Sequence, residues 1–77
     1  MNKSRRSRID EIIQKIEDLC YDIDVLRDEE EESYENLPES IQYSDRGEAM
    51  SEAIDNLESA ISSLEEATEY LNEAKGE

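Results

Sequence analysis

The second half of the chain, from Ser51 to Ala74, repeats its apolar side chains every seven residues. Three series recur with this period: Ala53, Ala60, Ala67 and Ala74; Ile54, Ile61 and Thr68; and Leu57, Leu64 and Leu71. Spacings that alternate between three and four place such series side by side along one stripe of an α-helix. The stripe needs a second helix to cover it, and the small alanine side chains allow that helix to come close.

The first half of the chain carries a second stripe of the same kind. Its apolar residues follow one another at spacings of three or four: Ile9, Ile12, Ile16, Leu19, Ile23 and Leu26. Ile13 and Cys20 lie seven residues apart and widen this stripe on one flank. A wide stripe is typical of a helix that is covered by more than one neighbour.

An acidic run, Asp28–Glu32, follows this stripe and interrupts it. Glutamate favours helix, so we expect the first helix to continue to Asn36, with its stripe either loosened or shifted to Tyr34 and Leu37. We interpret the run as a solvated helix face. Calcium loops need Gly and spaced oxygen ligands, and carboxylate di-metal sites in bundles normally pair Glu with His, which this chain lacks.

Pro38 separates the two helical segments, because the residue before a proline disfavours helical geometry. The second helix has two candidate starts. One is an Asp-x-x-Glu capping box formed by Asp45 and Glu48, and the other is Ser44 as a competing N-cap. Gly76 is expected to end this helix.

The predicted fold is all-α, with two long antiparallel helices that form a helical hairpin in a single domain. We expect a basic N-terminal arm over residues 1–8 with Ser7 as a candidate N-cap, a first helix over 9–36, a connector over 37–45 and a second helix over 46–75. A connector this short makes the two helices antiparallel neighbours.

Two helices cannot cover all of this apolar surface. We expect the first helix to pack along the alanine flank, and a residual stripe to stay partly exposed in a monomer: Ile12, Ile16, Leu19, Ile23, Ile54, Leu57, Ile61, Leu64 and Leu71. Large exposed apolar patches usually mark an interface. A two-fold homodimer that forms a four-helix bundle is the simplest closure. Because each copy carries a net charge of −15, salt should strengthen the association.

Charge is distributed unevenly along the chain. Residues 1–8 contain four of the 8 basic residues and no acid, and all 23 acidic residues follow them. An acidic body repels nucleic acid and anionic membranes and favours basic partners. We interpret the basic arm as solvated or in contact with the acidic body, and the alternative is that it binds an anion. Direct binding to nucleic acid or membrane is not expected.

The sequence predicts a protein without catalytic, cofactor or metal sites. It has no His and no Gly-rich phosphate loop, and a two-helix chain offers no obvious pocket for a titratable group. Cys20, the single cysteine, fits a reducing compartment, and we interpret it as a small core residue. A cross-dimer disulfide or a reactive thiol is the alternative. No apolar run approaches the ~20 residues that span a membrane, so a cytoplasmic protein is expected.

The segment Tyr34–Met50, YENLPESIQYSDRGEAM, resembles a signature of small acidic proteins encoded by bacteriophages and prophages of Gram-positive bacteria. The matching positions are Asn36, Leu37, Pro38, Glu39, Ser40, Ile41, Gln42, Ser44, Asp45, Arg46, Gly47 and Glu48. The resemblance implies a helical hairpin of phage origin that acts in the host cell. It implies no reaction.

The connector is richer in large side chains than a turn between helices requires. In one interpretation, Leu37, Ile41 and Tyr43 cover the open end of the bundle, and Arg46 pairs with a nearby glutamate. In the other, the connector holds a contact patch, since Tyr and Arg are favoured at interface hot spots. The candidate residues of this patch are Tyr34, Ile41, Tyr43 and Arg46.

We therefore expect a small acidic interaction module that docks a host or phage protein through a helical face and the connector. The alternative is a DNA-mimic inhibitor, whose carboxylates imitate phosphates and occupy the basic cleft of a host nucleic-acid-binding or defence protein. Salt distinguishes the two, because mimicry weakens as salt rises whereas a hydrophobic interface does not.

Overall fold

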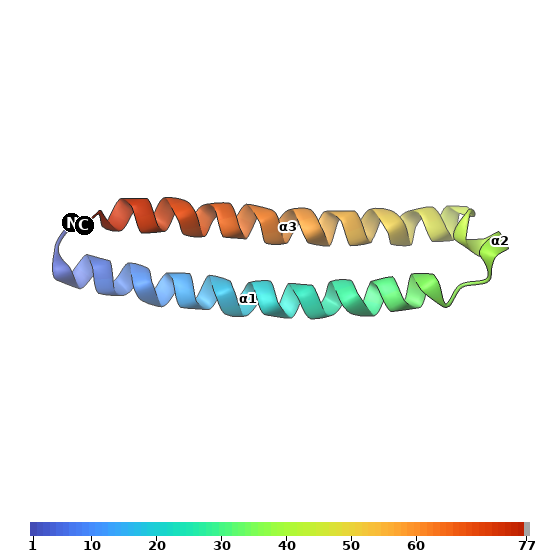
Figure 1. Cartoon of the computed structure of the whole chain (residues 1–77), viewed down its shortest axis with the longest axis horizontal. Helices are drawn as coiled ribbons and strands as arrows, with labels where there is room; N and C mark the ends of the chain where they lie inside the picture. The colour runs from blue at the N-terminus through green and yellow to red at the C-terminus, as the bar shows by residue number, and fades with distance from the viewer. Residues whose placement is uncertain (77) are drawn as a thin grey trace.

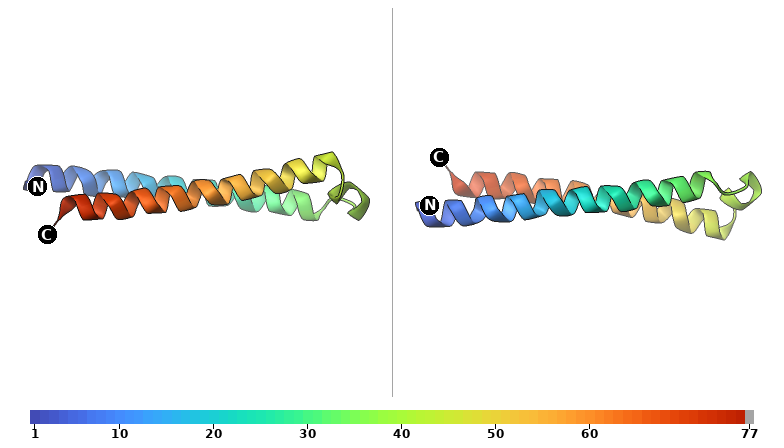
Figure 2. Two further views of the ribbon diagram at one scale, coloured as in Figure 1. Left: turned by 90° about the horizontal axis from the view of Figure 1, so that it is seen from above. Right: turned by 90° about the horizontal axis from the view of Figure 1, so that it is seen from below.

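The computed structural model describes residues 1–76 and forms an all-α helical hairpin (Figure 1). Three helices follow one another along the chain: α1 (Lys3–Glu35), α2 (Glu39–Gln42) and α3 (Asp45–Lys75). The long helices α1 and α3 are antiparallel, and both ends of the chain lie at the same end of the rod (Figure 1). The rod measures 58 × 15 × 13 Å. Its two long helices cross at a shallow angle, as sequences with seven-residue repeats favour (Figure 2).

The basic N-terminal residues belong to α1, which corrects the expected arm over residues 1–8. The helix begins at Lys3 rather than at Ile9, and Asn2 rather than Ser7 is its N-cap. The side-chain oxygen of Asn2 accepts a hydrogen bond from the backbone N–H of Arg5 at 2.8 Å. Asn is among the strongest N-caps, and Lys and Arg favour helix, so the basic segment is helical.

The other helix ends lie close to their expected positions. α1 ends at Glu35, one residue before Asn36, and Gly76 ends α3 with a positive φ of 66°. Of the two candidate starts of α3, Ser44 is the N-cap, and its hydroxyl accepts from the backbone N–H of Gly47 at 3.5 Å. The capping box is therefore wrong, because Asp45 is already inside the helix. Its carboxylate in the first turn still interacts favourably with the helix dipole.

The seam between α1 and α3 is thin. Among residues 1–76, Ile13 is the one buried apolar side chain, with 9% of its surface exposed. Residues seven apart form columns along each helix. Ala53, Ala60 and Ala67 of α3 are partly covered at the edge of the seam, and two further partly covered columns per helix line it. They are Ile9, Ile16, Ile23 and Glu30 with Ile13, Cys20, Arg27 and Tyr34 on α1, and Met50, Leu57, Leu64 and Leu71 with Ile54, Ile61, Thr68 and Lys75 on α3.

The orientation of α1 differs from the one expected. The sequence predicts Ile13 and Cys20 on the flank of the stripe, whereas in the structure they lie in the seam. The column of Ile12 and Leu19 lies outside it instead, with 45% and 52% of these side chains exposed. Both columns flank the Ile16 column equally, so spacing alone does not decide between them. Beyond the acidic run, the partly covered column continues to Tyr34, as one of the two alternatives expected.

The chain leaves more surface in water than a compact protein of its size. It exposes 5766 Å², whereas a compact monomer of 8.9 kDa exposes about 4,800 Å². Part of this excess comes from the rod shape itself. Several large apolar side chains are among the exposed residues, including Ile12, Leu19 and Leu26.

Candidate functional site

An apolar surface, here named the apolar rim, runs along one side of the seam. It consists of one column from each helix: Ile12, Leu19 and Leu26 from α1, and Ala53, Ala60, Ala67 and Ala74 from α3. In an antiparallel pair of helices, columns that follow the seam columns in the same rotational sense lie on the same side of the seam. A groove lined by Leu26, Ala53 and Leu57 shows this juxtaposition directly.

The three large residues of the apolar rim are the most informative, because roughly half of each side chain is in water. Ile12 is 45%, Leu19 52% and Leu26 54% exposed. On α3 the rim borders a column that also carries no charge: Ala49, Asn56, Ser63 and Tyr70. In a chain whose residues are 40% charged, an uncharged surface along most of α3 is a clear departure from the rest of the sequence.

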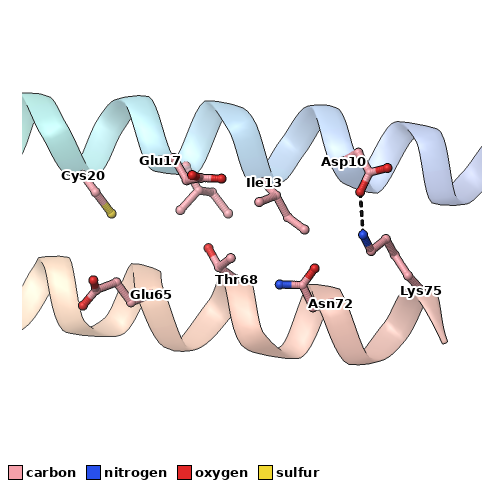
Figure 3. Close-up of a pocket in the computed structure, with 9 residues that line it drawn as sticks. Asp10, Ile13, Glu17, Cys20, Glu65, Thr68, Asn72 and Lys75 are labelled. Atoms are coloured by element: carbon pink, nitrogen blue, oxygen red, sulfur yellow. Dashed lines mark hydrogen bonds and ion pairs between the residues drawn. The ribbon is translucent and has the colours of Figure 1, made fainter. Parts of the chain in front are cut away.

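The opposite side of the seam is acidic, and we name it the acidic rim. Its columns are Asp10, Glu17, Asp24 and Glu31 on α1, and Ser51, Glu58, Glu65 and Asn72 on α3. Figure 3 shows a groove on this side, with Glu17 and Glu65 beside Cys20 and Thr68. At its end, Lys75 Nζ lies 2.7 Å from Asp10 Oδ1 and links the last turn of α3 to α1. The acidic rim therefore combines solvated carboxylates with two that form cross-helix ion pairs, Asp10 with Lys75 and Glu58 with Arg27.

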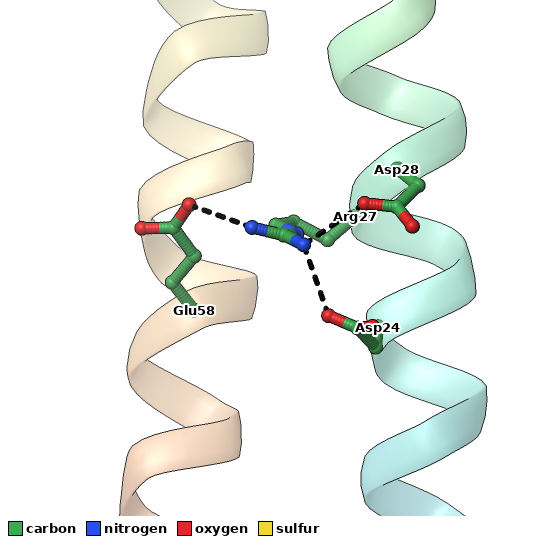
Figure 4. Close-up of polar contacts among 4 residues, drawn as sticks. All are labelled: Asp24, Arg27, Asp28 and Glu58. Atoms are coloured by element: carbon green, nitrogen blue, oxygen red, sulfur yellow. Dashed lines mark hydrogen bonds and ion pairs between the residues drawn. The ribbon is translucent and has the colours of Figure 1, made fainter.

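Arg27 forms the centre of the strongest charge cluster in residues 1–76 (Figure 4). Its guanidinium lies 3.0 Å from Asp24, 2.9 Å from Asp28 and 3.4 Å from Glu58, which is on α3. The hydrogen bond to Glu58 raises the pKa of Arg27, with smaller contributions from the charges of Asp24, Asp28 and Glu31. The guanidinium stays charged, and its Nε is buried without a hydrogen-bond partner in the described residues. A polar residue in a seam of this kind specifies register at some cost in stability.

The connector is a compact turn held by side chains. Gln42 Nε2 donates to the backbone oxygens of Tyr34 at 3.2 Å and Leu37 at 3.3 Å, and the Ser44 hydroxyl donates to the backbone oxygen of Ile41. Gly47 lies directly against Gln42, because a Cβ at this position would be 2.1 Å from the Gln42 carbonyl oxygen. The turn therefore requires Gly at the start of α3.

The residues of the predicted connector patch are only partly brought together. Tyr34 and Ile41 are half-buried and pack into the turn, whereas Tyr43 is 77% exposed and Arg46 is exposed. Tyr34 and Tyr43 line one groove, and Arg46 is not part of its lining. Within residues 1–76, the ion pairs do not include Arg46, so the expected pairing with a glutamate is absent there. The connector therefore offers one exposed aromatic ring rather than a formed patch.

The sequence reasoning passed over Arg27 and Lys75, which make every cross-helix ion pair in the described residues. The sequence does contain a signal for these two residues. Arg27 continues the column of Ile13 and Cys20, and Lys75 continues the column of Ile61 and Thr68. A basic residue at a seam position in so acidic a chain indicates a carboxylate on the opposite helix.

None of the helices within residues 1–76 is long and apolar enough to cross a membrane. In the same residues, no group of three or more Cys, Asp and Glu side chains is arranged to hold a metal ion. Comparison of the chain with known protein families, with curated proteins and with solved structures finds no match.

Proposed function

We propose that this protein is a small, non-enzymatic, phage-type interaction module that docks a partner protein against its apolar rim and the neighbouring connector. One observation carries the proposal. α1 turns its more apolar column, with Ile12, Leu19 and Leu26, toward water. It turns the column that contains Cys20 and Arg27 toward α3.

The cost of this arrangement argues for a partner. An isolated hairpin would gain the most from burying the isoleucine and the two leucines, since each is worth about 1.5–3 kcal/mol when fully covered. Instead the hairpin uses a cysteine and an arginine in its own seam. This choice is favourable overall when a second protein covers the apolar rim, because Ile12, Leu19 and Leu26 are then buried as well, while Arg27 keeps its carboxylate partners in the seam.

The resemblance of the Tyr34–Met50 segment to small acidic phage proteins supports a setting in the cytoplasm of a host cell. The partner is either a second copy, which would complete a four-helix bundle, or a host or phage protein with an apolar helical surface. Tyr43, with 77% of its surface exposed, lines a groove with Ser51 of the acidic rim, so the connector offers its contact on that side of the seam.

A capture experiment with two matched variants tests the proposal. Tagged wild type, Leu19→Asp and Val25→Asp are used to bind proteins from host lysate at low and high salt, together with untagged copies of the chain. Val25 is 39% exposed on the outer side of α1, away from the apolar rim, so its variant controls for an added carboxylate. We expect capture that persists at high salt, is lost in Leu19→Asp and is kept in Val25→Asp. Capture that Leu19→Asp leaves unchanged would contradict the proposal.

DNA mimicry is the second candidate, and the acidic rim favours it. Four carboxylates recur along α1 with the seven-residue period, facing Glu58 and Glu65 of α3. A basic cleft that binds this rim would release the protein as salt rises. Replacing Glu17 and Glu65 by Gln should then weaken capture, whereas Leu19→Asp should not.

A further inference from the structure

We propose that the apolar rim is covered by a second copy of this chain, with α1 packed antiparallel against α1 of the other copy about a two-fold axis at Leu19. This arrangement rests on the proposed function of the apolar rim and adds the identity, direction and register of the partner. Three observations carry it: the dimensions of the rod, a charge pattern beside the rim, and the agreement of two separate pairings on one axis.

The dimensions of the rod fit a partner of the same length. One face of 58 by 15 Å is about 870 Å², close to the ~800 Å² per partner of a standard protein interface. The apolar rim occupies the middle of this face, over roughly 21 Å from Ile12 to Leu26 on α1 and roughly 32 Å from Ala53 to Ala74 on α3. A second rod of the same dimensions covers the whole apolar rim and also brings the charged residues beside it against their counterparts in the other copy.

A column of four charges borders the apolar rim on the outer side of α1. Its residues are Arg8, Lys15, Asp22 and Glu29, all exposed and seven apart. The two at the N-terminal end are basic and the two at the C-terminal end are acidic. Within residues 1–76, none of the four takes part in an ion pair or a side-chain hydrogen bond.

This charged column is complementary to its own reverse. When two α1 helices lie antiparallel, Arg8 of one copy faces Glu29 of the other, and Lys15 faces Asp22. Each interface then gains four ion pairs by two-fold symmetry. A parallel arrangement would place like charges together. Packing α1 over α3 of the other copy would offer these charges no counterpart, because the corresponding column of α3, which includes Asn56 and Tyr70, is uncharged.

The apolar side chains and the charges define the same axis independently. Equal distances from Leu19 pair Ile12 of one copy with Leu26 of the other, and Leu19 with itself. The pairing of Arg8 with Glu29 and of Lys15 with Asp22 has its midpoint within one residue of Leu19. An axis at this turn also places the alanine columns of the two α3 helices against each other. Small side chains there allow close approach and a compact four-helix bundle.

A charge-swap series tests the direction and the register. The dissociation constant of the dimer is measured by sedimentation for the wild type, Lys15→Glu, Asp22→Lys and the double variant. Each single variant places like charges opposite each other twice and should raise the dissociation constant about tenfold. The double variant keeps the net charge of −15 and restores complementarity, so it should return to within about twofold of the wild type. Lys3→Glu has the same charge change as Lys15→Glu but lies in the column of Asp10, on the acidic rim, and should have little effect.

Failure to rescue would overturn the arrangement. If the double variant dimerises as weakly as the weaker single variant, Lys15 does not face Asp22. Circular dichroism of each variant ensures that a loss of dimer is not a loss of helix. A second readout uses Leu19→Cys in a Cys20→Ser background. A cysteine on the axis should form an interchain disulfide under mild oxidation, whereas Val25→Cys should not.

The outcomes also separate this inference from the proposed function. A wild type that stays monomeric, yet captures another protein in a manner that Leu19→Asp abolishes, overturns the second copy and retains the rim as an interaction surface. Leu19→Asp without effect on either dimer or capture overturns both. The proposed function and the antiparallel arrangement are both supported if Leu19→Asp breaks the dimer and if the double variant of Lys15 and Asp22 regains the dimer that each single variant weakens.

Discussion

Arg27 on α1 reaches across the seam to Glu58 on α3, with Nη1 3.4 Å from Oε1, at a position where a helical hairpin ordinarily carries an apolar side chain. Asp24 and Asp28 hold the same guanidinium from its own helix. The cluster ties the register of the two helices at one level, since sliding either helix by one turn would separate Arg27 from Glu58.

We predict that Arg27→Met raises the midpoint of thermal unfolding. The variant puts apolar surface into the seam and removes the buried Nε that has no hydrogen-bond partner. Asp24 and Asp28 are 50% and 62% exposed, so both carboxylates return to water without a buried charge left behind. Arg46→Met is the matched control, because Arg46 is exposed and outside the ion pairs of the described residues. A lower midpoint for Arg27→Met would show that the ion pairs outweigh the packing.

The charge on Arg27 should be insensitive to pH over the range in which the protein is handled. Its pKa is raised above its ordinary value, first by the hydrogen bond to Glu58. When folding raises the pKa of a base, the charged base stabilises the folded state fully at any pH below its ordinary pKa. For an arginine, this stabilisation is lost only in strong alkali. Consequently, the difference in unfolding midpoint between the wild type and Glu58→Gln should be constant from neutral pH to about pH 10. A difference that vanishes within this range would contradict the cluster.

Gly47→Ala should destabilise the connector although alanine favours helix. The added Cβ would lie 2.1 Å from the Gln42 carbonyl oxygen and 2.7 Å from its Cα, both backbone atoms that move only with the turn. We expect a loss of about 1–3 kcal/mol in the free energy of unfolding, against a helix-propensity gain of about 1 kcal/mol. Denaturant titration measures it. Ser63→Ala, exposed in the same helix, should be neutral or slightly stabilising.

Asn2→Ala tests the start of α1. Removing the side-chain oxygen that accepts from Arg5 leaves a backbone N–H of the first turn without its cap. The loss should be about 1 kcal/mol and local to the first turns. Faster amide exchange from Arg5 to Arg8, with unchanged exchange near Ile23, is the expected result. Unchanged exchange throughout would indicate that the helix begins later.

Leu64→Asp tests the seam. Leu64 is half-buried between the helices. A carboxylate at this position has no basic residue in its own column to pair with, because Lys75 belongs to the neighbouring column. The expected loss of about 3 kcal/mol is comparable to the entire stability of a chain this small, so most of the helical circular dichroism should disappear. Ser62→Asp, exposed on the outer side, is its control. An unchanged spectrum for Leu64→Asp would contradict the seam assignment.

The hairpin could be predicted from the sequence because its evidence is local. The seven-residue series from Ile54 to Leu71 require a long helix, and Pro38 places the break. Composition alone does not locate the start of α1, because a basic segment is compatible with either an arm or a helix, and the cap at Asn2 decides for the helix.

The side of α1 that faces α3 could not be predicted from spacing. The columns of Ile12 and Ile13 flank the Ile16 column equally, and the more apolar of the two is the one exposed. A rule that buries the most apolar stripe in a monomer therefore gives the wrong side. The ion pair between Arg27 and Glu58 forms only when the Ile13 column is inward, and that information lies in the packing of two helices rather than in one.

The most direct test of the apolar rim as an interface is the solution mass of the free protein. Sedimentation equilibrium at about 0.5 M salt, where charge repulsion is screened, compares the wild type with Leu19→Asp and Val25→Asp. We predict twice 8.9 kDa for the wild type and Val25→Asp, and 8.9 kDa for Leu19→Asp. A wild type of 8.9 kDa that captures no protein through Leu19 would contradict the account.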